Sequence, residues 1–465
     1  MKIYRTILNL WKESLFWQII TLFLLFTLIT LFIFNHRLPN ILTQYGMPDI
    51  DTDGGLWYQW YLHYIKTHQL VYDIANVAGY PLGYDISASP ASNLVFSVQL
   101  FIMEHISGFS LKNLIFITNL SSLITYPRSA IGGYLLWYYF TRDKYSSFIA
   151  GLIFGFSFYH VYMGRGQMSI NHIELIAFYF LSFFYFLDKK SSFSLILSAL
   201  TFALLFMSDP YYAFFSGIFS VIFVLFYKKE SFIEIIKTLF IYFIPVGIIL
   251  ILVNFNFVLS NLYLFDKVAA IQTGRNSLPR NELTNILYYF TPISVGVLNK
   301  LPFLGSFLYS LTFSIAILGA IMSNKNRMIT LSLACFLLSI VLSAYIPNLF
   351  WINELYFRYF SMFRGVGRIA LLGYLFLGLS VGISLALVRK NILNKNQNKK
   401  YTIPAILALT CVIIINSLNI NQPWTRNTNF SKLTKLYEPV RVNNQKQVIA
   451  QYPIQLNFKT VDFTH

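Results

Sequence analysis

The sequence predicts an all-α integral membrane protein. We expect a polytopic helical bundle of about 11 transmembrane helices, with a large first extracytoplasmic loop that bears interfacial helices. Hydrophobic residues make up 56% of the chain and charged residues only 11%, against roughly 25% charged in a typical soluble domain. Apolar stretches long enough to cross the roughly 30 Å hydrocarbon core recur along the sequence. Both cysteines, Cys335 and Cys411, lie inside such stretches, so we expect buried hydrophobic residues rather than a disulfide or a metal pair.

The first predicted span runs from about Phe16 to Phe34. It is longer than a signal-peptide core and has no small-residue cleavage site, so it is predicted to be a retained signal anchor. Lys2, Arg5 and Lys12 precede it. Basic residues beside a first span favour the cytoplasm, which makes residues 35–112 the first extracytoplasmic loop.

That loop contains no segment able to cross the membrane. Residues 54–68 place Trp57, Trp60, Tyr61 and Tyr64 on one helical face, which is typical of a helix lying in the interface. A second short helix is predicted over 94–107.

Ten further spans complete the predicted bundle. They cover about 113–140, 148–162, 173–187, 192–208, 212–227, 238–258, 303–322, 328–346, 368–388 and 402–418. The short connectors at 141–144, 188–190, 228–230, 324–327 and 389–400 are basic. All of them fall on the side that this topology makes cytoplasmic, as the positive-inside rule requires. The predicted organisation is a transmembrane domain over 1–418, followed by a short extracytoplasmic tail over 419–465.

The charges divide between the two faces of the predicted bundle. The net charge of +17 is explained by basic cytoplasmic loops and anionic headgroups, so no nucleic-acid partner is expected. Only five of the 18 acidic residues fall on the cytoplasmic side, which leaves 13 on or near the other face. This skew indicates that the working face is the outer one.

The densest acidic cluster follows the first span, in MPDIDTDGGLWYQW. Asp49, Asp51 and Asp53 occupy alternate positions there. A carboxylate at a membrane surface can act as a general base, and carboxylate oxygens are the ligands that Mg²⁺ or Mn²⁺ prefers. The alternative for Asp53 is an ordinary N-cap of the aromatic helix. One helix start needs one cap, so the cap does not account for the other two.

A second polar group lies in HVYMGRGQMSINHIE, a short outer loop. It contains His160, Arg165, His172 and Glu174. Imidazole with carboxylate can bind a metal, or can hold a phosphate through a cation. The alternative is a polar helix cap with an interfacial histidine, because no metal-ligand spacing here is specific.

Asp209 is a further acid on the same face. In SDPYY it is followed by Pro210, and Asp with Pro at the first helical position is a strong helix-start signal. An acid at the edge of a membrane span is also a candidate functional residue.

Basic residues on this face are candidates for binding phosphate. The segment FRYFSMFRGVGR carries Arg358, Arg364 and Arg368, and Arg275 lies in a long loop. The arginine fork matches phosphate oxygens, and glycines allow the backbone to approach a ligand. Interfacial snorkelling onto headgroups is the alternative and suits Arg358 best. Arg364, Arg368, Arg275 and Arg165 are the phosphate-binding candidates.

Several common catalytic motifs are absent from the sequence. It has no P-loop, no HExxH and no GxSxG, which argues against nucleotide hydrolysis, zinc proteolysis and serine-hydrolase chemistry. Energy for a reaction would then come with the substrate, and a lipid-phosphate-activated donor supplies it.

The order of these motifs over residues 15–390 resembles the membrane glycosyltransferases of the GT-C fold, in particular a poorly characterised bacterial and archaeal branch. The motifs in chain order are PDIDTDGGLWYQW, YPLGYD, GLIFGFSFYHVYMGRGQ, HIE, SDPYY and FRGVGR. The chain departs from the family in having Pro48 where glycine is common. Many relatives also carry a large outer carboxy-terminal domain.

The resemblance implies that Asp51 or Asp53 is the catalytic base, that Asp49, His172, Glu174 or Asp209 completes the site, and that arginines bind the donor phosphate. It also implies a sugar donor on a polyprenyl phosphate, a glycan, lipid or protein acceptor, and an inverting transfer. A divalent cation, Mg²⁺ or Mn²⁺, would be the cofactor. The expected location is the cytoplasmic membrane of a bacterium or archaeon, with the active site facing outside. A flippase of lipid-linked saccharides is the first alternative, and a non-catalytic assembly protein is the second.

Overall fold

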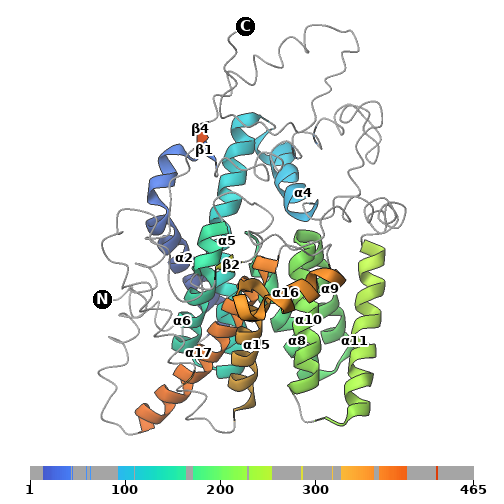
Figure 1. Ribbon diagram of the computed structural model, residues 1–465. Coiled ribbons are helices and arrows are strands. Elements are labelled where there is room, and N and C mark those ends of the chain that lie inside the picture. Colours follow the sequence, from blue (N-terminus) through green and yellow to red (C-terminus); the bar gives the residue numbers. More distant parts are fainter. Residues whose placement is uncertain are drawn as a thin grey trace, which may run out of the picture.

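The computed structural model is a bundle of helices (Figure 1). It describes residues 14–42, 44–45, 59, 63, 93–108, 110–163, 171–227, 230–253, 284–285, 317, 326–360, 366–394 and 426–427. The described α-helices are α2 (Leu15–Ile33), α4 (Asn93–Ile102), α5 (Leu111–Thr141), α6 (Lys144–Gly155), α7 (Phe158–Met163), α8 (Glu174–Lys189), α9 (Ser192–Ser208), α10 (Pro210–Phe226), α11 (Phe232–Val253), α15 (Arg327–Ser343), α16 (Phe350–Phe360) and α17 (Ile369–Asn394).

The remaining described elements are short. They are a 3₁₀ turn at Asn35–Asn40, a π turn at Met103–Ser107, and 3₁₀ turns at Pro347–Leu349 and Val366–Arg368. Two-residue strands form two isolated pairs. β1 (Gln44–Tyr45) is antiparallel to β4 (Arg426–Asn427), and β2 (Thr284–Asn285) is parallel to β3 (Ala344–Tyr345).

Tight turns join neighbouring helices at one end of the bundle, which we call the basic end. Arg142 ends α5 with φ 52°, and Asp143 then caps α6 by accepting from the Ser146 N–H. Lys190 ends α8 with φ 49°, and Ser191 forms a capping box at the start of α9. A left-handed residue followed at once by an N-cap reverses the chain within two residues. We call the opposite end, where α8, α10 and α17 begin, the site end.

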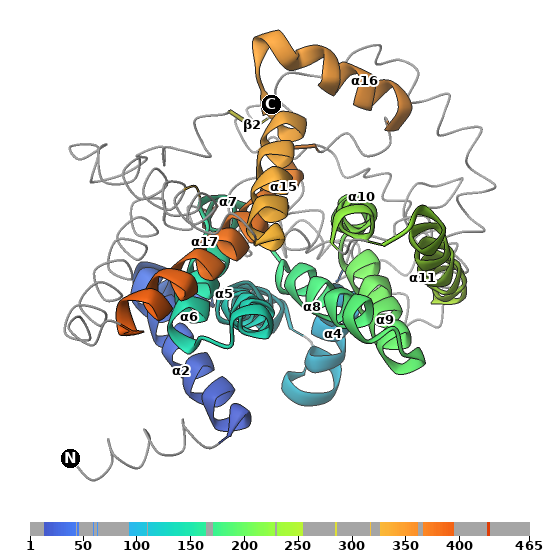
Figure 2. The ribbon, with the colours of Figure 1, turned by 90° about the horizontal axis from the view of Figure 1, so that it is seen from below.

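The core of the bundle depends on close approach of α5 and α6, which lie side by side in the view along the helices (Figure 2). Gly151 and Gly155 form a GxxxG pattern on α6. A Cβ added at Gly155 would lie 2.7 Å from Ala130 Cβ on α5. Small residues at this spacing let two helix backbones approach, which is a common way to associate helices in membranes.

A buried polar chain links four helices at mid-bundle. The Tyr179 hydroxyl on α8 lies 2.6 Å from the Ser220 hydroxyl on α10. The Tyr242 hydroxyl on α11 donates to Tyr179 at 3.1 Å and lies 3.0 Å from the Ser198 hydroxyl on α9. Hydroxyl groups that satisfy one another in an apolar interior fix the mutual positions of the helices that carry them.

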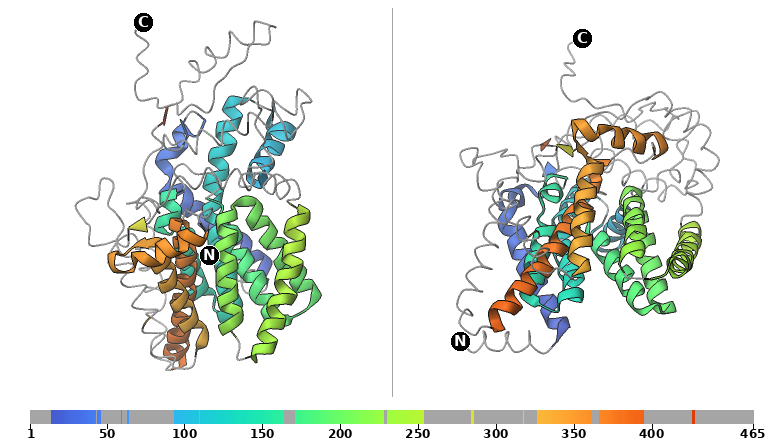
Figure 3. Two further views of the ribbon diagram at one scale, coloured as in Figure 1. Left: turned by 45° about the vertical axis from the view of Figure 1, so that its right-hand side comes forward. Right: turned by 60° about the horizontal axis from the view of Figure 1, so that its bottom comes forward.

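Helix α5 reaches beyond the site end of its neighbours (Figures 1 and 3). Its 31 residues correspond to about 46 Å of helix, more than the roughly 30 Å hydrocarbon core. The first turns of α5 and the neighbouring α4 therefore rise above the ends of α8 and α10. Helix α16 lies across the direction of α15 and α17 (Figure 3), and it exposes Trp351 and Tyr359.

Nine of the eleven predicted spans coincide with described helices, and one of these nine needs correcting. The span over 148–162 is two helices, α6 and α7, because the chain leaves helical geometry at Phe156 and Ser157. Residues 303–322, apart from residue 317, and residues 402–418 lie outside the described residues. Three described helices, α2, α11 and α17, are long and apolar enough to cross a membrane, by length and composition. The count of about 11 spans stays a prediction.

Predictions for the first loop are tested in part. The second short helix is confirmed as α4 and the π turn that continues it. Within the predicted aromatic helix, only Gln59 and His63 are described, both in helical conformation. Cys335 is buried, as predicted, whereas Cys411 lies outside the described residues.

Candidate functional site

An ion pair between Asp209 and Arg368 lies at the site end. Asp209 follows α9 and begins α10, where its Oδ1 accepts from the N–H groups of Tyr211 at 2.8 Å and Tyr212 at 3.3 Å. The other oxygen, Oδ2, accepts from Arg368 Nη1 at 2.7 Å. Asp209 is fully buried. The predicted N-cap is therefore confirmed, and the same carboxylate also holds an arginine.

Arg368 is positioned from two sides. Its guanidinium carbon lies 4.3 Å from the centroid of the Tyr211 ring, over the face of the ring. Its side chain is 22% exposed, so N–H groups other than the one bound by Asp209 can reach a ligand. Burial raises the pKa of Asp209, and the Arg368 guanidinium opposes that rise. A stacked, ion-paired arginine has a fixed direction, which suits recognition of an anion.

A second ion-paired cluster surrounds Glu174, the first residue of α8. Glu174 Oε1 forms an ion pair with Arg128 Nη2 at 2.8 Å and lies 3.0 Å from His172 Nδ1. The Arg128 side chain is 40% exposed, whereas those of Glu174 and His172 are buried. Glu174 Oε2 is buried and has no hydrogen-bond partner among the described residues. A buried carboxylate oxygen without a donor is a place where a further cation or donor would bind favourably.

The residues just before α8 are held by side chains of α5 and α7. Asn171 Nδ2 donates to the Ser122 carbonyl at 3.1 Å and to the Ser122 hydroxyl at 2.9 Å. His160 has Nδ1 2.7 Å from the Gly155 carbonyl and Nε2 3.0 Å from the Asn171 carbonyl. His160 is fully buried. It therefore joins α7 to the segment that carries His172. These contacts favour a structural role for His160 over a metal-binding role.

Helix α7 connects the two clusters. Its Tyr159 lies close enough to interact electrostatically with Tyr212 and Arg368. The next residue, His160, interacts with Glu174 in the same way. Tyr159 and His160 are adjacent on this short helix, so the Asp209 and Glu174 clusters both lie near α7 at the site end.

The structure tests only part of the predicted site. It brings His172 together with Glu174, and Asp209 together with Arg368. The remaining candidates, Asp49, Asp51, Asp53, Arg165, Arg275 and Arg364, lie outside the described residues. Two contacts attach the segment that follows the acidic motif to α4 and the π turn. Gln59 Nε2 donates to Gln99 Oε1, and His63 Nδ1 lies 3.2 Å from Glu104 Oε1.

Arg128 was missed by the sequence analysis. It follows Pro127 inside the long apolar span that became α5. A charged residue inside a span is a functional candidate in its own right, and this was the signal that could have identified it. Tyr211 was named only as part of the SDPYY motif, since its stacking on Arg368 depends on a tertiary contact.

The described residues provide no complete metal site. No group of three or more His, Cys, Asp or Glu that could hold a metal ion occurs among them. Glu174 supplies one free carboxylate oxygen and His172 an imidazole, but Arg128 already places a positive charge 2.8 Å from the other Glu174 oxygen. A cation here would need further acidic ligands.

Comparisons with known proteins show which solved structures share the fold of this chain. No protein-family model matches the chain, and no curated protein matches it. Among solved structures, the chain is similar to the oligosaccharyltransferase AglB of Archaeoglobus fulgidus in complex with an inhibitory peptide and a dolichol-phosphate. The TM-score is 0.55 at 12% identity, over 98% of this chain and 62% of that one. It is also similar to the arabinofuranosyltransferase AftD from Mycobacteria, with a TM-score of 0.52 at 12% identity, over 91% of this chain and 28% of that one.

The chain therefore spans less than two thirds of the length of these proteins. A further structure of the Archaeoglobus fulgidus enzyme, in complex with Zn and sulfate, matches with a TM-score of 0.51 at 13% identity, over 92% of this chain and 56% of that one. At such identities the likeness concerns the fold. This chain shares its fold, the predicted GT-C fold, with these solved structures.

Proposed function

We propose that this protein is a membrane glycosyltransferase that moves a sugar from a polyprenyl-phosphate donor to a glycan, lipid or protein acceptor. The observation that carries the proposal is the pair of acid–arginine clusters, Asp209 with Arg368 and Glu174 with Arg128, at one end of a GT-C fold. AglB has been solved with a dolichol-phosphate and a peptide, which supports a lipid-linked donor for this chain.

Arg368 would receive the negative charge of the departing lipid phosphate. Its guanidinium is oriented by Asp209 and by the Tyr211 ring, and part of it stays exposed. Donors that are already oriented stabilise developing charge without reorganising, which is the largest single contribution in many enzymes. Arg165, Arg275 and Arg364 are further phosphate ligands in this proposal.

Asp51 or Asp53 would act as the general base. The carboxylate takes the proton of the acceptor hydroxyl, the acceptor oxygen forms a bond to the anomeric carbon, and the bond from that carbon to the phosphate oxygen breaks. Attack opposite to the leaving group inverts the anomeric configuration. The contacts of Gln59 and His63 with Gln99 and Glu104 support this role, because they attach the chain just after the acidic motif to the helices above the site end.

A divalent cation, Mg²⁺ or Mn²⁺, would be held by Glu174 and His172 together with acids of the first loop, Asp49 among them. When bound, it would neutralise charge on the donor phosphate. Glu174 Oε2, which has no partner in the part of the chain that the structure describes, supports this assignment. Arg128 would hold Glu174 in place through the other oxygen.

The proposal includes a location and a topology. We place the protein in the cytoplasmic membrane of a bacterium or archaeon, with about 11 spans and the site end facing outside. The basic turns at the opposite end support this orientation, since Arg142, Lys144, Lys189 and Lys190 all lie there. The transmembrane domain would cover 1–418, with an extracytoplasmic tail over 419–465.

The test uses purified protein in lipid with a panel of polyprenyl-phosphate sugars and mass spectrometry of the lipid. Release of sugar-free lipid phosphate from at least one donor is expected. A sealed-vesicle assay runs in parallel. Movement of an intact lipid-linked saccharide across the bilayer, with no change of mass from any donor, would overturn the proposal in favour of a flippase.

A further inference from the structure

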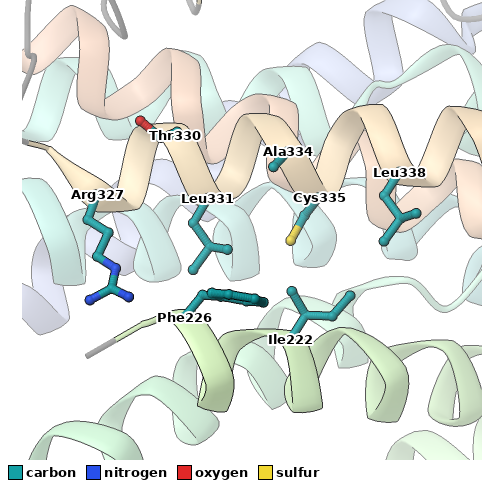
Figure 4. Close-up of a pocket in the computed structure, with 8 residues that line it drawn as sticks. All are labelled: Ile222, Phe226, Arg327, Thr330, Leu331, Ala334, Cys335 and Leu338. Carbon is teal, nitrogen blue, oxygen red and sulfur yellow. The ribbon is translucent and has the colours of Figure 1, made fainter. Parts of the chain in front are cut away.

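A cavity of about 340 Å³ lies between α10 and α15, towards the basic end (Figure 4). Ile222 and Phe226 of α10 face Leu331, Cys335 and Leu338 of α15 across it. We call this cavity the α10–α15 groove. It runs along both helices, and its walls are almost wholly apolar.

The size and walls of the α10–α15 groove suit a hydrocarbon chain. Packed protein interiors leave few voids larger than a water molecule, and this larger apolar groove has room for a hydrocarbon chain. Phe226, at the basic end of the groove, is 52% exposed. In a bilayer, an acyl chain would cover it.

One charged residue closes the groove at its basic end. Arg327, the first residue of α15, points its guanidinium beside Phe226 (Figure 4). Its Nη1 is buried and has no hydrogen-bond partner among the described residues. A buried donor without an acceptor is costly, and a guanidinium is best satisfied by a phosphate or carboxylate. The beginning of a helix adds a partial positive charge at the same place.

Neighbouring charges also favour an anion from outside the protein, rather than a protein carboxylate, as the partner of Arg327. The described acids of the basic end are already engaged, since Glu230 pairs with Lys190 at 2.9 Å and Asp188 accepts from the Tyr139 and Tyr227 hydroxyls. In the sequence, Lys228 and Lys229 follow α10 after Tyr227, and Lys325 lies two residues before α15. The groove therefore combines an apolar lining with an arginine whose Nη1 has no acceptor among the described residues.

We propose that the α10–α15 groove binds one anionic glycerophospholipid of the membrane leaflet at the basic end. An acyl chain lies between α10 and α15, and the phosphate accepts from Arg327. This site is separate from the site proposed for glycosyl transfer. The donor phosphate is assigned to Arg368 at the site end, whereas Arg327 lies at the basic end. The bound lipid acts as a structural ligand that joins α10 to α15.

Native mass spectrometry of the purified protein tests this with phosphatidylglycerol and phosphatidylcholine of identical acyl chains. Both lipids carry the phosphate, but the choline cation of phosphatidylcholine would lie beside the positive charge of Arg327. Wild type is therefore expected to retain one phosphatidylglycerol at least about tenfold more strongly than phosphatidylcholine. Arg327→Gln should lose that preference. Lys237→Gln removes a positive charge from exposed α11 and should keep it.

A second pair of variants tests whether the apolar lining of the α10–α15 groove binds the acyl chain. Ala334 lines the groove, whereas the 45% exposed Leu337 on the same helix is not among its lining residues. Ala334→Phe should therefore weaken lipid retention, and Leu337→Phe should not. Equal retention of both lipids by wild type, or an unchanged preference in Arg327→Gln, would overturn the proposal. Preferential binding of a polyprenyl phosphate, lost in Arg327→Gln, would also overturn it, because the groove would then belong to the donor.

Discussion

Asp209 and Arg368 are 159 positions apart in the sequence, yet their side chains meet with Oδ2 and Nη1 2.7 Å apart. The contact joins the turn between α9 and α10 to the start of α17. It gives one carboxylate two tasks, since Asp209 also caps α10. Breaking a buried ion pair by removing one partner is costly, so the pair fixes both the helix ends and the direction of the arginine.

Replacing Arg368 tests its role in binding phosphate. Arg368→Lys keeps the charge but loses the planar fork and the stacking on Tyr211. We expect kcat for sugar transfer to fall about 100-fold, as when one donor to a developing charge is removed. Steady-state kinetics with a defined lipid donor measures this. Arg142→Lys, at the basic end, is the control and should keep wild-type rates; a similar loss in both variants would argue against a specific role for Arg368.

Replacing Glu174 tests the proposed cation. Glu174→Gln keeps an oxygen that can accept from Arg128 but removes the charge that a cation requires. The cation concentration that gives half-maximal activity should rise by about tenfold or more, in the range seen when groups around a metal are changed. A titration of Mg²⁺ and Mn²⁺ after chelation measures it. Glu354→Gln, an exposed acid of α16, serves as the control. Full activity of wild type and of Glu174→Gln in the presence of chelator would show that no cation is needed.

The contact between α5 and α6 makes a stability prediction. Gly155→Ala places a Cβ 2.7 Å from the Ala130 Cβ and backbone nitrogen, so the helices must separate. We expect a loss of about 1–3 kcal/mol in the free energy of unfolding, the usual range for overpacking. Gly247→Ala on α11 has nothing within 4 Å of the added Cβ and should be neutral. Thermal unfolding in one detergent compares the two, and equal melting temperatures would refute the packing argument.

Removing one hydroxyl tests the buried polar chain. Tyr179→Phe leaves the hydroxyls of Ser220 and Tyr242 without their shared partner. Interhelical hydrogen bonds within membranes average about 0.6 kcal/mol each, so a loss of roughly 1 kcal/mol is expected. Tyr359→Phe, on a residue that is 70% exposed, is the matched control. An unchanged melting temperature in Tyr179→Phe would mean that the hydroxyls find other partners.

Helices were the part of the structure that the sequence predicted best. Long apolar runs and basic connectors identify a span and its direction independently of distant residues, and α9 and α15 fall within a few residues of the prediction. The break at Phe156 and Ser157 was missed, because Gly and Ser also occur inside membrane helices and no Pro or Asn marks the break.

Side-chain partners were predictable only where they are local. His172 and Glu174 are two residues apart, so their contact follows from the helix start. The N-cap by Asp209 is local for the same reason. The partners Arg368 and Arg128 come from other helices, and their identity depends on how α17 and α5 pack. Sequence spacing carries no information about that packing.

The central claim is transfer from a lipid phosphate by a loop carboxylate, and one measurement tests it most directly. Lipid-phosphate release from the donor found active is compared between wild type and the double variant Asp51→Asn/Asp53→Asn. Glu234→Gln, on the exposed surface of α11, is the control for loss of an acid. We predict that the control keeps wild-type release and that the double variant loses it. Full release by the double variant would contradict the account.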